Sequence, residues 1–232
     1  MSSIKLISAD SAHYTRPPSA HKVFYINQRT LSSTTTMTAS APTYREQQQK
    51  AASDGASQFV DQFYVCVNGS PTPLRTFYVS SSTKYTTSAI PANVDISVNG
   101  KVLAGGPDEY ESMLKAQRMT PSGIEAKVRY EVDGWDCQII NPEFSIGCPD
   151  NLLQKYEEEK KNTAKTPSRE FFNRCSLLVQ VTGTVTFAGG EKDERKVFND
   201  VFVLVPNWDT HVKNPSRNAK RWLVLSQNFR SL

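Results

Sequence analysis

The sequence predicts an α+β domain in which helices pack on one face of a curved, mainly antiparallel sheet. Two observations support this prediction. Helical periodicity occurs early in the apolar region, whereas long runs with strand periodicity fill its second half. Helices followed by strands favour segregated layers over the alternating order of a parallel α/β fold. The length of 232 residues suits one domain with extensions.

The first 42 residues are expected to form a disordered tail. They are rich in Ser, Thr and Pro and lack a sustained apolar pattern, so they offer little surface to bury. The chain has a net charge of +4, and this tail holds four basic residues against Asp10. The expected domain, residues 43–232, is therefore nearly neutral. Nucleic-acid-binding domains usually concentrate basic residues on one face, so any RNA contact should be local and weak.

The four cysteines show neither paired redox spacing nor metal-ligand spacing. They are Cys66, Cys137, Cys148 and Cys175. The sequence shows no apolar signal-peptide core and no run of membrane-spanning length. We therefore expect reduced thiols in the cytosol or nucleus, no membrane partner, no metal and no other cofactor.

The first strong element is a helix over residues 44–67. Its apolar residues recur at intervals of three and four and form one stripe wide enough to cover a sheet. The stripe comprises Ala56, Phe59, Val60, Phe63, Tyr64 and Val67. A short apolar segment follows at residues 74–79, and its periodicity fits helix and strand equally well.

A tight hairpin is expected around Asn99-Gly100. The residues before this pair alternate between apolar and polar, and Asn-Gly tolerates positive φ at both turn positions. Gly105-Gly106-Pro107 then introduces a second helix, because Pro suits the first helical turn and the acidic residues after it favour the helix dipole. Thr120-Pro121 is expected to end this helix.

Four strands are expected in the remainder of the chain. They cover residues 124–140, 177–187, 197–205 and 222–229. Asp133-Gly134 marks a bulge or turn in the first of them. Residues 142–174 form an insertion with a short helix and balanced charges, which is either a solvated spacer or a docking loop.

Alternation divides the residues of these strands between two faces. One face carries Val, Thr, Asn, Gln and Trp with few charges, a composition typical of the centre of a protein interface. In the last strand, Leu223, Leu225 and Phe229 are assigned to one side and Trp222 to the other. Trp222 is then the expected interface anchor, because buried aromatic residues often dominate binding energy.

The ordered set of these elements resembles the nuclear transport factor 2-like fold, a cone whose helices pack on the concave face of the sheet. Residues 197–204, Trp222-Leu223-Val224 and Ser226-Gln227-Asn228-Phe229-Arg230 resemble its last two strands. The resemblance covers residues 44–232 except the insertion. The insertion and Arg221-Trp222-Leu223 further suggest the small subunit of the fungal mRNA-export receptor.

This resemblance implies a non-catalytic subunit that pairs with the large receptor subunit through its open sheet face. The implied interface residues are Gln180, Thr182, Thr184, Asn199, Val201, Val203, Trp222, Val224, Ser226 and Asn228. The family's complex binds Phe-Gly repeats of nucleoporins and carries ribonucleoprotein, mRNA and pre-ribosomes, through the nuclear pore. A protein that shuttles between nucleus and cytoplasm is therefore expected.

RNA or pre-ribosome contact, also implied by the resemblance, is assigned to basic residues of the insertion and of the segment before the last strand. They are Lys160, Lys161, Lys165, Lys213, Arg217, Lys220 and Arg221.

Two other functions stay open at this point. The same fold also hosts isomerases and dehydratases, which need a general acid or base at the wall of an interior pocket. All three histidines fall outside the expected strands and helices, and only Asp200 and Tyr64 are placed to reach the interior. The other alternative is a homodimeric carrier for a small nuclear GTPase, which would use the same sheet face against a second copy.

Overall fold

The computed structural model describes residues 43–88, 91–119, 126–162, 167–188, 193–212, 214–215 and 219–232. The expected disordered tail and the helix stop at Thr120-Pro121 lie outside these residues.

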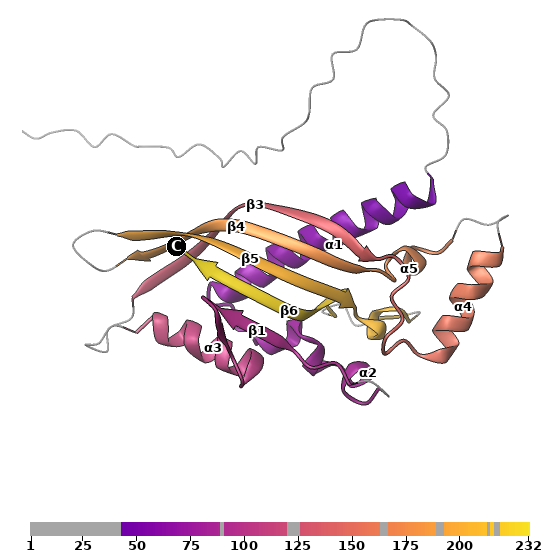
Figure 1. Ribbon diagram of the computed structural model, residues 1–232, viewed down its shortest axis with the longest axis horizontal. Coiled ribbons are helices and arrows are strands. Elements are labelled where there is room, and N and C mark those ends of the chain that lie inside the picture. Colours follow the sequence, from indigo (N-terminus) through magenta and orange to yellow (C-terminus); the bar gives the residue numbers. More distant parts are fainter. Residues whose placement is uncertain are drawn as a thin grey trace, which may run out of the picture. The chain divides into compact units, whose positions relative to one another are not determined.

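Six strands form one curved, unclosed sheet in the order β2-β1-β6-β5-β4-β3 (Figure 1). The strands are β1 (Asp95–Val98), β2 (Lys101–Val102), β3 (Lys127–Asn141), β4 (Ser176–Ala188), β5 (Glu194–Pro206) and β6 (Trp222–Ser231). Neighbouring strands are antiparallel except β1 and β6, which run parallel. The predicted α+β class with a mainly antiparallel sheet is confirmed.

The helices are long at the start of the domain and short in its connections. The α-helices are α1 (Tyr44–Val67), α2 (Thr83–Thr86), α3 (Gly106–Gln117), α4 (Asp150–Lys161) and α5 (Arg169–Phe172), and the 3-10 helices are η1 (Leu74–Phe77), η2 (Val79–Ser81) and η3 (Trp208–Thr210). The undecided segment at residues 74–79 is thus a pair of 3-10 turns. Across the described parts of the chain, none of the helices has the length and apolar character needed to span a membrane.

Helix α1 has the predicted bounds, Tyr44–Val67, and begins at a capping box that was not predicted. The side chain of Thr43 accepts a hydrogen bond from the backbone N–H of Glu46, while the Glu46 carboxylate accepts one from the backbone N–H of Thr43. The apolar stripe of α1 is buried against one face of the sheet together with Tyr110 and Leu114 of α3. Both helices therefore cover the same face, which we call the helix face (Figure 1).

The Asn-Gly hairpin is confirmed between β1 and β2. Asn99 has φ 50° and Gly100 has φ 85°, the left-handed values that the sequence pair predicts. Pro107 lies in the first turn of α3, also as predicted.

A second apolar cluster lies at the Pro206 end of β5 and contains the buried apolar residues of the insertion. Leu152 and Tyr156 of α4, Phe171 and Phe172 of α5, and Trp208 of η3 are buried in it. Val205 and Leu223 belong to the same cluster, although they point away from the helix face. The described insertion is therefore packed against the sheet rather than a solvated spacer.

Three register shifts interrupt the strand pairing. One lies between Ile139 and Asn141 at the end of β3, and the other two are bulges that bear on the predictions. Val132 pairs with Gly183 and Gly134 with Thr182, so Asp133 is the extra residue of β3, which confirms the predicted irregularity. In the second bulge, Val203 pairs with Ser226 and Leu204 with Val224, so Leu225 is the extra residue of β6. No sequence signal led us to expect this second bulge.

Candidate partner interface

The face of the sheet opposite α1 and α3, which we call the open face, presents side chains from β1, β3, β4, β5 and β6. Its central row crosses three strands, because Gln180 pairs with Val201 and Val201 pairs with Asn228. In a second row Leu178 pairs with Val203 and Val203 with Ser226. These side chains are half-buried or exposed in the isolated chain. The centre of the face is therefore apolar and accessible, with amides and hydroxyls beside it.

Hydrogen bonds between neighbouring strands orient several polar groups of this face. Thr184 Oγ1 donates to Asp133 Oδ2 over 3.3 Å, and Ser97 Oγ donates to Asn228 Oδ1 over 3.2 Å. These contacts hold the polar side chains in one arrangement before any partner binds. Such preorganisation lowers the entropic cost of association.

Eight of the ten residues assigned to the interface lie on the open face. They are Gln180, Thr182, Thr184, Asn199, Val201, Val203, Ser226 and Asn228. Their role in binding stays a prediction, whereas their common placement follows from the strand registers.

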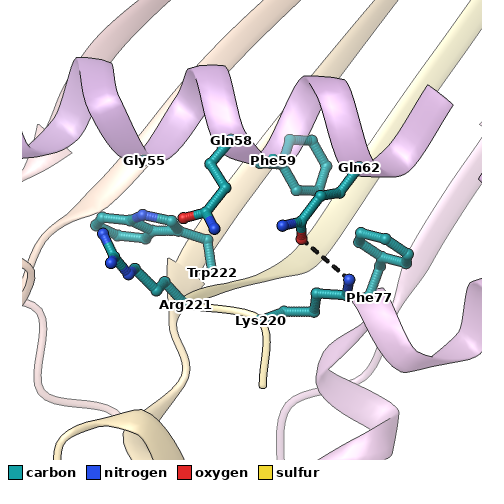
Figure 2. Close-up of a pocket in the computed structure, with 8 residues that line it drawn as sticks. All are labelled: Gly55, Gln58, Phe59, Gln62, Phe77, Lys220, Arg221 and Trp222. Atoms are coloured by element: carbon teal, nitrogen blue, oxygen red, sulfur yellow. Dashed lines mark hydrogen bonds between the residues drawn. The ribbon is translucent and has the colours of Figure 1, made fainter. Parts of the chain in front are cut away.

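Trp222 and Val224 lie on the helix face, so their assignment to the open face was wrong. Their side chains are 2% and 0% exposed, and both belong to the main core. The bulge at Leu225 is the physical reason, because one extra residue reverses the faces of all residues before it relative to those after it. Figure 2 shows the Trp222 indole beneath α1 at Gly55. Trp222 is therefore a core residue of this domain.

Two residues of the open face were missed in the sequence. Leu178 lies inside the strand expected at residues 177–187 and continues the alternation that contains Gln180, so the same alternation would have included it. Ser97 reaches this face because β1 pairs in parallel with β6, where Ser97 is opposite Asn228. The sequence carries no signal for that pairing.

The basic residues assigned to RNA contact do not gather into one surface within the described chain. Lys160 and Lys161 are exposed at the end of α4, and the Lys160 Nζ lies 2.7 Å from Glu143 Oε1. The Lys220 Nζ donates to Gln62 Oε1 over 3.0 Å and lies 4.6 Å from the centre of the Phe77 ring. Arg221 follows it beside Trp222. Lys165, Lys213 and Arg217 lie outside the described residues.

Asp200 and Tyr64, the two candidates for interior catalysis, hydrogen-bond each other inside a filled core. Tyr64 Oη donates to Asp200 Oδ2 over 3.2 Å, and Gln227 Nε2 donates to the same oxygen over 2.9 Å. Burial raises the pKa of Asp200 to about 7, although both hydrogen bonds act in the opposite direction. Across the described residues, no three His, Cys, Asp or Glu side chains are grouped as a metal site requires.

The raised pKa of Asp200 predicts a pH-dependent stability. The folded state favours the neutral form of Asp200. The contribution of Asp200 to the free energy of unfolding should therefore be largest below about pH 4 and should be lost as the pH rises to about 7. Asp200→Asn should remove this loss, which is on the order of 2–4 kcal/mol. Urea unfolding of both proteins at pH 5 and pH 8 measures it. A variant that is destabilised equally at both pH values would contradict the prediction.

Burial also lowers the pKa of His211, to about 4, and this residue gives the opposite slope. Stability from neutral His211 is present above about pH 6.5 and is lost as the pH falls to about 4. The contribution is common to the wild type and Asp200→Asn, so it cancels when their pH profiles are subtracted.

Comparison with known proteins was made at the level of sequence and of structure. No protein-family model and no curated protein sequence matches the chain. Solved structures do match it, among them three that each match over 78% of this chain and 99% of the other. They are a Sac3N peptide bound to Mex67:Mtr2 (29% identity, TM-score 0.65), the Chaetomium thermophilum Mex67 NTF2-like domain complexed with Mtr2 (30%, 0.63), and a structure of Mtr2 (28%, 0.62).

These matches extend over nearly the whole of each relative, and they agree with the sheet order and the one-sided helices described above. The chain therefore belongs to the Mtr2 family of proteins with the nuclear transport factor 2-like fold.

Proposed function

We propose that this chain is the small, non-catalytic subunit of a nuclear mRNA-export receptor and pairs with the large subunit through its open face. The observation that carries the proposal is the accessible apolar centre of that face, around Val201, Val203 and Leu178, in a chain of the Mtr2 family. One of the matching structures holds Mtr2 complexed with the NTF2-like domain of Mex67.

The composition of the open face supports a protein partner. Its centre is apolar and its surroundings are mainly amides and hydroxyls, which can be paired across an interface at lower desolvation cost than charges. Charged residues lie beside this centre, since Asp136 pairs with Gln180 at the β3 end of the central row and Arg230 pairs with Asn199 in the adjacent row. This distribution matches the apolar core and polar rim of specific interfaces.

The proposed complex supports binding of nucleoporin Phe-Gly repeats and export of ribonucleoprotein, mRNA and pre-ribosomes, through the nuclear pore. The chain then shuttles between nucleus, pore and cytoplasm. A peptide partner is consistent with the Sac3N peptide bound to Mex67:Mtr2 in one related structure. RNA contact is local in this proposal, because the basic residues proposed for it do not form one surface. Among them, Lys160 contacts Glu143 and Lys220 contacts Gln62.

The burial and hydrogen bonding of Asp200 support a non-catalytic role. Asp200, the carboxylate that an isomerase or dehydratase would need, has Tyr64 and Gln227 on one oxygen and is fully buried among core aromatic rings. A general base must reach the proton that it removes. Asp200 has no access to a substrate in this packing.

The test is the mass of the complex in solution. We expect the chain, co-expressed with the large receptor subunit, to purify as a one-to-one complex by light scattering, and to self-associate at high concentration when expressed alone because its apolar face is exposed. A stable homodimer that does not bind the large subunit would instead support the GTPase-carrier function. A stable monomer that does not bind it would contradict both binding functions.

A further inference from the structure

A narrow notch lies on the helix side of the domain, between α1 and the start of β6 (Figure 2). It is lined by Gly55, Gln58, Phe59, Gln62, Phe77, Lys220, Arg221 and Trp222. Its cavity volume is about 10 Å³, which is the room that one oxygen atom or one water molecule needs. Because α1 covers the face opposite the open face, this notch lies away from the proposed subunit interface.

The wall of the notch contains a hydrogen-bond donor without an acceptor. Trp222 is 2% exposed, and its Nε1 donates no hydrogen bond to the described residues. A buried donor left unpaired costs roughly 1–3 kcal/mol, so buried Trp N–H groups almost always have a partner. By contrast, Trp208 Nε1 donates to the backbone oxygen of Ile146 over 2.9 Å.

Gly55 brings the indole this close to α1. A Cβ at residue 55 would overlap Trp222 Nε1, so only glycine fits at this point of the helix. Glycine inside a helix costs about 1 kcal/mol relative to Ala. Gly55 therefore destabilises α1 slightly but leaves the space in which the unpaired Trp222 Nε1 lies against the helix.

The charges around the notch select the ligand. Its lining contains two cations, Lys220 and Arg221, and two amides, and it contains no carboxylate. Gln58 and Gln62 are four residues apart on α1 and so lie on the same side of the helix. An acceptor oxygen with negative charge would therefore lie near an indole N–H, two cations and two side-chain amides, and Lys220 Nζ, which donates to Gln62 Oε1 over 3.0 Å, keeps further N–H groups for it.

We propose that this notch binds an acidic side chain, Asp or Glu, of a partner peptide. One carboxylate oxygen enters the notch and accepts a hydrogen bond from Trp222 Nε1, while the charge is neutralised by Lys220 and Arg221. Phe59 and Phe77 provide an apolar wall for the neighbouring part of the peptide. A peptide is favoured over RNA because the domain is almost neutral and the notch admits one oxygen, not a run of phosphates.

The experiment follows the indole signals of the ¹⁵N-labelled full chain by NMR. The chain has three tryptophans, and the Trp222 signal is assigned through its own ring connectivities. The probes are acetylated and amidated hexaglutamate, hexaglutamine of the same length, and a single-stranded hexauridylate. We expect hexaglutamate to shift the Trp222 indole signal saturably and hexaglutamine to leave it unchanged.

Charge variants test the site directly. The double variant Lys220→Gln with Arg221→Gln should weaken hexaglutamate binding about tenfold or more, because charge-assisted hydrogen bonds are lost. Lys101→Gln, which removes a charge whose side chain is 75% exposed on β2, should leave the affinity unchanged. Circular dichroism confirms that each variant is folded.

Several results would overturn the proposal. An unshifted Trp222 signal would mean that the notch holds water only. Equal shifts with hexaglutamine would remove the role of charge, and equal losses for Lys101→Gln would indicate non-specific attraction. Tighter binding of hexauridylate at the same signal would assign the notch to RNA. None of these outcomes depends on the large subunit, so the proposed heterodimer is tested separately.

Discussion

Trp222→Ala is expected to lower the free energy of unfolding of this chain by about 3–5 kcal/mol, which is the usual cost of truncating a buried Trp. The indole is 2% exposed and fills the space between Gly55 of α1 and the neighbouring strands. Removing it leaves a cavity that α1 cannot close, because the rest of its apolar stripe is already packed. Urea unfolding followed by circular dichroism measures the loss.

Trp135→Ala is the matched control for this prediction. Trp135 stands on β3, at the edge of the sheet, and its side chain is 36% exposed. The same substitution there should cost clearly less stability, because the Trp135 side chain has fewer protein contacts to lose and water can fill the space that it leaves. Equal costs for the two variants would show that Trp222 is not a core residue. If Trp222→Ala had wild-type stability but bound the partner more weakly, Trp222 would belong to the interface rather than to the core.

Local patterns in the sequence predicted most of the elements, because each pattern acts over a few residues. The stripe of α1 and the Asn99-Gly100 turn depend on side chains within one or two turns of each other. Even the bulge at Asp133 had a local signal in Asp133-Gly134. Where propensity, periodicity and turn chemistry agree, the local structure follows without knowledge of the fold.

The face of Trp222 could not be predicted by the same reasoning. Alternation was applied through the last strand without interruption, whereas Leu225 is an extra residue opposite the Val203-Leu204 step. No Gly, Pro or Asp-Gly pair marks this bulge. It depends on long-range packing, because Trp222 fits beside Gly55, a residue 167 positions earlier in the chain.

The ends of the open face were also set by contacts that the sequence does not show. Val205 lies on the same face as Val201 and Val203, as alternation predicts. It is nevertheless buried, because the second apolar cluster covers that end of the open face. Likewise, Ser97 joins the face only through the parallel pairing of β1 with β6. Alternation assigned the faces, but it could not show which part of a face stays accessible.

The accessible centre of the open face gives the second large prediction. Val201→Asp should weaken binding of the large receptor subunit by at least about a hundredfold, because an unpaired charge buried in an interface costs roughly 2–5 kcal/mol. The free variant should still fold, since Gln180 and Asn228 flank residue 201 and water reaches it in the isolated chain. Isothermal titration with the large subunit measures the affinity, and thermal unfolding checks the fold.

Val65→Asp is the control that separates a specific interface from a general effect of charge. Val65 is 62% exposed on α1, the helix that covers the other face of the sheet. It receives the same new carboxylate, so its affinity for the large subunit should stay within about threefold of the wild type, as expected for a site outside the contact. Wild-type affinity of Val201→Asp would place the subunit contact elsewhere. An equal loss for both variants would mean that added negative charge, rather than burial at the open face, opposes association. Only a loss confined to residue 201 assigns the interface to the apolar centre of the open face.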